Sequence, residues 1–385
     1  MTNDERISMG TGQLQICPVN SRRLLRTFIK FPWKVYKGDS NWVPPLLSEM
    51  KKKFDPSENP FFKYADVAPF IAIHRGEPVG RIAAILNTRH NEFHKDKVGF
   101  FGFFECVEDV AVAERLFEAA KEWLTRRKME VIRGPVNFST NEECGLLIDG
   151  FDDPPAVMMP YNPPYYPALL ESCGLRKAKD LYAYTIEDTA VLPEKLFRVT
   201  NLVKEKAGIT FRSINFSNLR EEIEVLKSIY NSAWAPNWGF YPVTEEEFEY
   251  MAKELKRFAA PDLILIAEVD GKPVGFSLTM PDVYQALKKC NGRLFPFGIF
   301  RFLRDRKKID RARVMVLGIV EGYRRRGIDA LFYLETFQRG KKLGYKRGEL
   351  SWILEDNTAM NNAVEALGAR LYKKYRIYEG LIKSR

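Results

Sequence analysis

The chain has 385 residues, of which 45% are hydrophobic, 13% aromatic and 29% charged. This composition is typical of a folded globular protein and excludes disordered and fibrous classes, and the length favours two domains. The net charge of +10 favours anionic partners in general, such as coenzyme phosphates, nucleic acid or an acidic membrane surface. The N-terminus is polar and no apolar run could span a bilayer, so we expect a cytoplasmic protein without a transmembrane segment. The five cysteines are scattered and lack C-x-x-C spacing, which argues against a disulfide framework, and we expect no metal site.

The predicted elements alternate between helices and strands in both halves of the chain. In the first half they are a hairpin at 71–80, a strand at 99–105, a helix at 111–127, a strand at 131–135 and a short helix at 165–173. In the second half they are helices at 219–234 and 244–258, a hairpin at 263–280, a strand at 314–319, a helix at 328–343, a strand at 349–354 and a helix at 358–367. A final aromatic strand closes each half. This order predicts an α/β fold.

Two segments of the first half recur in the second. Residues 71–80 align with 266–275, sharing Ile, Ala, Gly, Pro, Val and Gly in register, and residues 170–176 match 364–370. Because the two matches occur in the same order at nearly constant separation, we interpret the chain as a tandem duplication. The polar stretch 187–193 contains the expected boundary, which gives domains at 1–190 and 191–385.

The most specific local pattern is a buried strand, a basic glycine turn and an amphipathic helix, at residues 314–331. The turn reads Arg324, Arg325, Arg326 and Gly327, and the helix begins at Ile328. Free N–H groups and the positive dipole end of such a helix can bind a pyrophosphate, and arginines add charge-assisted hydrogen bonds. The pattern therefore predicts a phosphate-binding site in the second half.

These residues resemble the coenzyme A signature of the GNAT acyltransferase superfamily, which reads Gln or Arg, two residues, Gly, one residue, then Gly or Ala. Arg324 and Gly327 fit it, and the preceding Leu317, Ile319 and Tyr323 resemble the splayed strand of that family. Residues 357–364, followed by Leu-Gly at 367–368, match the asparagine-led helix of the family in spacing. The resemblance implies two tandem GNAT-like domains, each a mixed central sheet flanked by helices, and acetyl-CoA or another acyl-CoA as cosubstrate.

The resemblance also implies a function, which is transfer of an acyl group, acetyl above all, from acyl-CoA to a small-molecule or peptide amine. It assigns coenzyme binding to Leu317, Gly318, Ile319, Arg324, Arg325, Arg326, Gly327, Ile328 and Asp329, and catalytic roles to Tyr375, Asn357 and Glu355. Asp329 departs from the family's Gly or Ala, and Val364 replaces the tyrosine that protonates the leaving thiolate in many members. Tyr375 is our candidate for that general acid. Glu268, Glu349 and Glu105 are further candidates for the general base.

The first half lacks an arginine-glycine turn between Glu105 and Ala111, where residues 106–109 are acidic instead. A coenzyme site there would have no anion-binding turn. We therefore expect a degenerate first domain and one coenzyme site per chain. The polar loop 137–145 follows a strand at a place that can face the acceptor in this fold.

Residues 284–313 form a connection too long for a compact domain, and they combine an apolar stretch with a basic run. Between Arg301 and Arg313, seven Lys or Arg accompany only two aspartates. Four interpretations remain open for this segment: a lid over an acyl chain, a contact with anionic lipid, a contact with RNA, or a solvated surface. Two alternatives to acetyl transfer also remain, namely a long-chain acyl or aminoacyl-tRNA donor, and a coenzyme-binding protein without activity. The sequence does not predict the oligomeric state.

Overall fold

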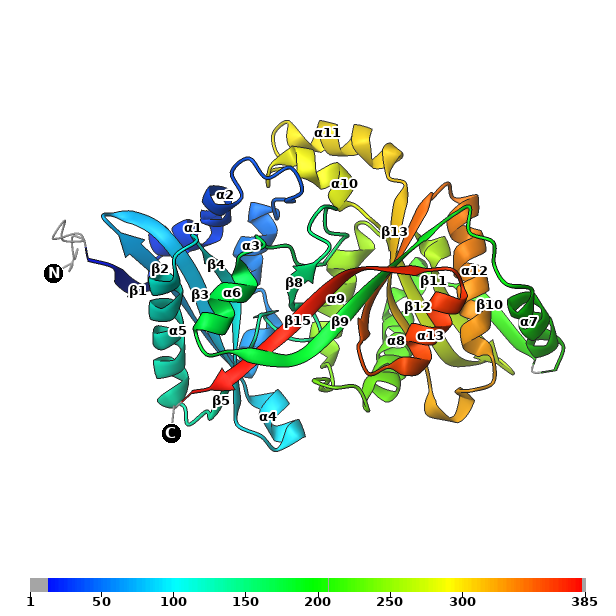
Figure 1. The fold of residues 1–385 in the computed structure, drawn as a ribbon. Helices are drawn as coiled ribbons and strands as arrows, with labels where there is room; N and C mark the ends of the chain where they lie inside the picture. Colours follow the sequence, from blue (N-terminus) through cyan, green and yellow to red (C-terminus); the bar gives the residue numbers. More distant parts are fainter. Residues whose placement is uncertain (1–12, 207, 383–385) are drawn as a thin grey trace.

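The computed structural model describes residues 13–206 and 208–382. One continuous mixed sheet runs through the whole molecule, with helices on both of its faces (Figure 1). The sheet has 13 strands in the order β1-β2-β3-β4-β5-β15-β9-β14-β13-β12-β11-β10, and β8 pairs with β15 beside this path. The predicted α/β class is confirmed.

The first half contributes most strands at one end of the sheet. Its strands are β1 (Gln15–Pro18), β2 (Ala65–His74), β3 (Glu77–Asn87), β4 (Val98–Cys106), β5 (Val131–Gly134), β6 (Val136–Asn137), β7 (Glu143–Cys144), β8 (Leu146–Asp149) and β9 (Arg176–Glu187). Its helices are α1 (Arg22–Lys30), α2 (Pro32–Val35), α3 (Leu47–Lys53), α4 (Thr88–His94), α5 (Val110–Thr125) and α6 (Tyr166–Ser172). Residues of β3 alternate between two apolar clusters, so both faces of the sheet are covered here.

The second half builds the other end of the sheet. Its strands are β10 (Ile209–Ser213), β11 (Ile264–Val269), β12 (Lys272–Pro281), β13 (Arg311–Ile319), β14 (Arg347–Leu354) and β15 (Arg370–Leu381). Its helices are α7 (Glu194–Lys206), α8 (Leu219–Trp234), α9 (Glu245–Lys256), α10 (Tyr284–Leu287), α11 (Gly298–Asp305), α12 (Ile328–Lys342) and α13 (Thr358–Ala366). Helix α12 packs on one face of β11 and β13, and α8 packs on the other face. The predicted helices and strands of this half are confirmed.

The two hairpins of the repeat have the same geometry. The register shifts by one residue at Ala72 between β2 and β3, and at the aligned Ala267 between β11 and β12. Both turns place a non-glycine residue and then a glycine at positive φ, with values of 51° and 78° in the first half and 50° and 74° in the second. Equal bulges and equal turns are what a duplicated unit would keep.

The last strands of the two halves are exchanged. The first half ends with β9, which pairs with β14 of the second half, and the second half ends with β15, which pairs with β5 of the first. Strands β9 and β15 lie side by side across the middle of the molecule (Figure 1). The halves therefore share their central strands, and neither completes its own sheet alone. The boundary near residue 190, which falls between β9 and α7, stays a prediction.

Candidate functional site

The glycine turn leaves the N-terminus of α12 without a side-chain cap. Gly327 is the N-cap residue, has φ +80° and makes no capping hydrogen bond, because it has no side chain. A Cβ at this position would lie 2.7 Å from a methyl group of Val203 on α7. The first N–H groups of α12 therefore stay available to an anion at this end of the helix.

The strand before this turn separates from its neighbour. Strands β13 and β14 pair in parallel only as far as Val314 and Leu350. Beyond that point β13 continues along β12, with a bulge at Met315, while β14 continues along β9. A cavity of about 820 Å³ opens between them, lined by residues 314–319 and 350–354. The V-shaped opening provides unpaired strand edges beside the glycine turn.

Most of the predicted coenzyme residues meet in this cavity. Those that line it are Leu317, Gly318, Ile319, Arg324, Arg325 and Asp329. Arg324 spans the end of β13 and the end of α8, since its guanidinium donates to Ile319 O at 3.1 Å and to Ala233 O at 2.7 Å. Its role in the structure is thus to hold the turn, and it has one terminal nitrogen left for a phosphate.

The other predicted coenzyme residues do not line the cavity. The guanidinium of Arg326 lies 4.9 Å from the ring centre of Tyr323, on the exposed side of the turn. Ile328, the first residue of α12, is fully buried and joins the apolar cluster between this helix and the sheet. Gly327 shapes the turn through its backbone, and the N–H groups of the first helical turn follow it.

The predicted catalytic residues are separated in the structure. Asn357 lines the cavity, but its side chain caps α13 by accepting from Met360 N at 3.2 Å. Glu355 lies outside the cavity, where it pairs with Lys177 at 2.5 Å and accepts from Asp180 N. Tyr375 is fully buried in the central apolar cluster, and its hydroxyl has no partner among the described residues. Tyr375 does not reach the coenzyme cavity, because β15 turns this side chain into the core shared by the two halves.

The further candidates for the base also have structural partners. Arg212 pairs with Glu268 at 2.6 Å. Glu349 is fully buried and accepts from the hydroxyls of Ser351 and Tyr372. Neither these two glutamates nor Glu105, the third candidate, lines the coenzyme cavity. Glu105 lines a different, apolar cavity, described below, and accepts from Tyr36 and Tyr166.

The equivalent opening of the first half is filled by the chain itself. Strands β4 and β5 also pair in parallel and then separate, but Val136 enters the gap so closely that a Cβ on Gly102 would lie 1.7 Å from its carbonyl oxygen. The N-cap residue of α5 in this half is Asp109, whose carboxylate accepts from Ala111 N and Val112 N. Both the cleft and the helix N-terminus are therefore occupied by protein groups in the first half.

A second cavity, of about 450 Å³, lies between the two halves and is mostly apolar. Helix α9 forms one wall, and its apolar lining residues are Phe248, Met251, Ala252 and Leu255, beside Tyr250, Glu254 and Lys256. None of the residues of α9 is buried, although the helix is amphipathic, because its apolar face borders this space. The Thr244 and Glu247 capping box starts the helix and fixes its position.

The two cavities share part of their lining. Six residues border both of them: Asn141, Glu142, Met158, Tyr230, Met315 and Val316. We call this set the junction. Two of the six, Glu142 and Tyr230, are titratable. The loop 137–145, predicted to face an acceptor, supplies Asn141 and Glu142, while α8 supplies Tyr230.

The polar groups of the junction are held by neighbouring side chains. Lys53 on α3 pairs with Glu142 at 2.6 Å, and the hydroxyl of Tyr230 donates to Asn141 Oδ1 at 3.1 Å. Burial opposes the charge on Lys53, but Glu142 and Glu143 outweigh it and raise its pKa. Burial also raises the pKa of Tyr230, so this phenol stays protonated at neutral pH. The junction thus combines a carboxylate with a neutral phenol. Sequence analysis missed Tyr230, whose only signal is its place on the apolar face of α8.

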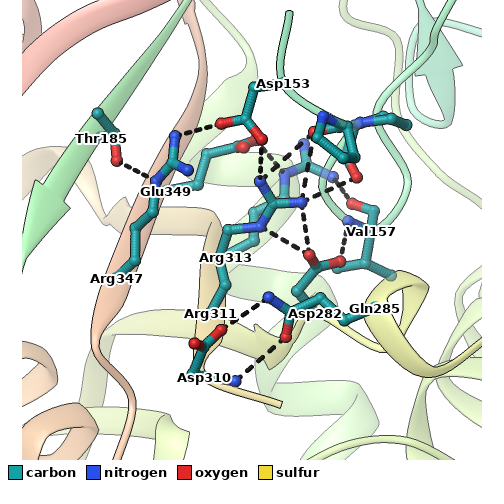
Figure 2. A network of polar contacts seen from close by, with 12 residues as sticks. Asp153, Val157, Thr185, Asp282, Gln285, Asp310, Arg311, Arg313, Arg347 and Glu349 are labelled. Carbon is teal, nitrogen blue, oxygen red and sulfur yellow. Dashed lines mark hydrogen bonds and ion pairs between the residues drawn. The ribbon is translucent and has the colours of Figure 1, made fainter. Parts of the chain in front are cut away.

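A buried polar network fixes the loop that ends at the junction. Figure 2 shows Arg311 and Arg313 of β13 pointing into the space between Asp282, Asp153 and Glu349. Arg311 pairs with Asp282 at 2.6 Å, and Arg313 donates to Val157 O, next to Met158 of the junction. Burial raises the pKa of Asp282 to about 6, although Arg311 opposes this. The network anchors residues of the first half against β13.

Within the described ranges, no three His, Cys, Asp or Glu side chains are grouped so that they could hold a metal ion. None of the described helices has the length and apolar character needed to cross a membrane.

Comparison with known proteins gives relatives along nearly the whole chain. The chain is 38% identical over 362 residues to protein YghO of Escherichia coli K12, covering 92% of each. It is 36% identical over 375 residues to a bacterial ceramide synthase of Caulobacter vibrioides, covering 95% of this chain and 97% of that protein. No protein-family model matches the chain.

Solved structures share the fold at low sequence identity. A tandem GNAT protein from the clavulanic acid biosynthesis pathway matches with a TM-score of 0.56 at 11% identity, over 97% of this chain and all of that one. A probable N-acyltransferase from Enterococcus faecalis matches with a TM-score of 0.51 at 10% identity, over 96% of this chain and 73% of that one. The chain therefore belongs to the family that includes protein YghO and the Caulobacter ceramide synthase, and its fold is that of the GNAT superfamily.

Proposed function

We propose that the protein is an N-acyltransferase that moves a long-chain acyl group from acyl-CoA to the primary amine of a lipid. The observation that carries this proposal is the junction, where an apolar cavity of about 450 Å³ adjoins the cleft between β13 and β14. A cavity of this size is within the usual range for ligand pockets, which is about 300–1,000 Å³. An acetyl group would leave it empty.

The coenzyme would lie in the cleft with its pyrophosphate at the N-terminus of α12. Gly327 exposes the helix N–H groups, and Arg324 and Arg325 supply positive charge. Asp329 also borders the cleft and opposes the phosphates, so binding depends on the arginines outweighing it. The pantetheine arm would follow the free edge of β13 toward Met315.

The acyl chain would pass the junction and enter the apolar cavity. Its walls there are mostly aliphatic and aromatic, and each methylene removed from water gains about 0.8 kcal/mol. This favours a long chain over the acetyl group that sequence analysis preferred. The name of the Caulobacter relative supports the same choice, because a ceramide is the amide of a fatty acid with a long-chain amino alcohol.

The junction residues would serve the chemical step. The acceptor nitrogen attacks the thioester carbonyl carbon, the C–N bond forms and the C–S bond breaks. The carboxylate of Glu142 accepts the proton lost by the amine, and the hydroxyl of Tyr230 gives a proton to the departing coenzyme thiolate. Asn141, which is hydrogen-bonded to Tyr230, holds this phenol in place, and a proton from solvent restores it.

The test is direct detection of the product. Purified protein is incubated with palmitoyl-CoA and the long-chain amino alcohol sphinganine, and the amide is measured by mass spectrometry. We expect amide formation that Glu142→Gln reduces by about 10²-fold or more, in the range of a lost general base. Glu118→Gln, at an exposed carboxylate of α5 that lines neither cavity, serves as the matched control and should leave the rate unchanged.

Two results would contradict the proposal. One is efficient turnover of acetyl-CoA with a water-soluble amine and none with palmitoyl-CoA, which would restore the acetyltransferase interpretation. The other is absence of acyl-CoA binding of any chain length by calorimetry, which would leave a binding or structural role.

A further inference from the structure

A patch of large apolar side chains is exposed on the edge of the molecule formed by α10 and α11. Phe295, Phe297, Phe300 and Leu303 are 77%, 74%, 69% and 45% exposed. Phe295 and Phe297 lie in the segment before α11, and Phe300 and Leu303 lie on the exposed face of that helix, which is at the top edge in Figure 1. Exposed apolar groups gathered in this way are uncommon on a protein that contacts only water. We call these four residues and their basic neighbours the docking surface.

The inner face of the same helix is firmly packed. Phe302 is buried and Ile299 half-buried in a cluster with α10, and Asp305 at the end of α11 pairs with Arg304 and Lys289. Phe300 and Leu303 are thus carried on a packed helix, and Phe295 and Phe297 lie in the short turn that leads into it. This arrangement favours a surface for an external partner over a lid.

Basic side chains surround the exposed phenylalanines. Exposed residues of this kind are Arg293, Arg301, Arg306, Lys307 and Lys308, and none of them pairs with a carboxylate of the described chain. A partner that complements the surface must therefore be apolar at its centre and anionic around it. A bilayer that contains acidic lipids has this chemistry, since acyl chains receive the aromatic groups and phosphates face the cations.

We propose that α10 and α11 dock the protein on an anionic membrane surface. The same segment borders the apolar cavity, because Val283, Tyr284 and Leu287 line it. It is also tied to α2 and α3 of the first half, since Leu47 N donates to Gly292 O at 3.0 Å and Trp33 Nε1 donates to Asn291 Oδ1 at 2.7 Å. Resting on the proposed function, this placement lets a lipid amine leave the bilayer and reach the cavity without crossing water.

The test is flotation of the purified full chain with vesicles, in the absence of acyl-CoA and acceptor. Vesicles of phosphatidylcholine alone are compared with vesicles of equal parts phosphatidylcholine and phosphatidylglycerol. We expect binding to the anionic vesicles that weakens in high salt. The triple variant Phe295→Ser, Phe297→Ser and Phe300→Ser should lower the partition more than tenfold, whereas Phe93→Ser, at an exposed phenylalanine of α4 on the opposite edge, should not.

The contribution of the basic residues to vesicle binding is tested with a double variant and a matched control. The double variant Arg301→Gln and Lys308→Gln should weaken binding to anionic vesicles by about fivefold for each charge removed. Each basic residue near an anionic membrane raises the binding constant by about that factor. Lys195→Gln with Arg198→Gln, two exposed charges on α7, should leave binding unchanged. Turnover of an acceptor dispersed in detergent should be the same in the triple phenylalanine variant and in the unmodified protein, which separates docking from catalysis.

Three outcomes would overturn the docking proposal while leaving the acyltransferase proposal intact. The first is equal flotation of the triple variant and the unmodified protein. The second is a loss of turnover in detergent by the triple variant, which would make the segment a lid. The third is binding of RNA, but not of vesicles, that depends on the same basic residues.

Discussion

A larger residue on the inner face of α9 should shorten the acyl chain that the protein prefers. Ala252 borders the apolar cavity, so Ala252→Trp places an indole where the distal part of the chain would lie. If the indole displaces about four methylenes, at about 0.8 kcal/mol each, the loss is roughly 3 kcal/mol or about 200-fold in kcat/KM for the longest chain. Shorter chains that end before the indole should react at the original rate.

The assay is release of coenzyme thiol across a series of acyl-CoAs from acetyl to stearoyl. The unmodified protein should show kcat/KM rising with chain length until the cavity is full, and the variant should stop rising earlier. Lys253→Trp is the control, because the neighbouring side chain is 69% exposed and faces away from the cavity. An unchanged chain-length profile in Ala252→Trp, with normal thermal unfolding, would refute the assignment of this cavity to the acyl chain.

Three further predictions concern the turn, the junction and a buried lysine. Gly327→Ala should weaken acyl-CoA binding about tenfold by calorimetry, because alanine resists φ +80°, whereas Gly322→Ala, with open space around it, should not. Tyr230→Phe should lower kcat without raising KM. Burial lowers the pKa of Lys373 to about 8, so with rising pH the folded chain releases this proton before the unfolded chain does. The unmodified protein should therefore gain stability relative to Lys373→Met as the pH rises from about 8 to about 10.5. Denaturant unfolding should show a gain of at most roughly 1.4 kcal/mol per pH unit.

Each of these three predictions would be contradicted by a specific result. Equal coenzyme affinity of the two glycine variants would remove the α12 N-terminus from the site. A Tyr230→Phe enzyme with unchanged kcat would assign the leaving-group proton to solvent. A stability difference between the unmodified protein and Lys373→Met that does not vary above pH 8 would mean that the lysine stays charged in the fold.

Local patterns predicted many of the helices and strands of both halves, although none of those before residue 65 was among them. The α8 helix begins and ends at the predicted residues, and β11 and β12 occupy the predicted hairpin. These elements are set by hydrophobic periodicity, caps and turn glycines, which are all encoded within a few residues. The glycine turn was also recognisable, because Gly327 and its arginines are adjacent in the sequence.

The exchange of β9 and β15 was not predictable in the same way. The repeat aligned the two strands correctly, but an aromatic strand has the same pattern whichever neighbour it joins. Tyr375 shows the consequence. Sequence analysis placed it beside the thioester, yet the shared centre of the sheet buries it in the core.

The junction depends on contacts between residues far apart in the chain. Glu142 comes from a loop of the first half and Tyr230 from a helix of the second, and no spacing rule connects them. The loop 137–145 was suggested by its polar residues after a strand. Its partner on α8 carried no signal of its own, since an aromatic residue on an apolar helix face usually belongs to the core.

The most direct test of the account is a structure of the protein with palmitoyl-CoA bound. We predict the pyrophosphate at the N-terminus of α12, the thioester between Glu142 and Tyr230, and the acyl chain inside the cavity bordered by α9. A bound coenzyme whose acyl chain lies outside this cavity, or a coenzyme bound in the first half, would contradict the account.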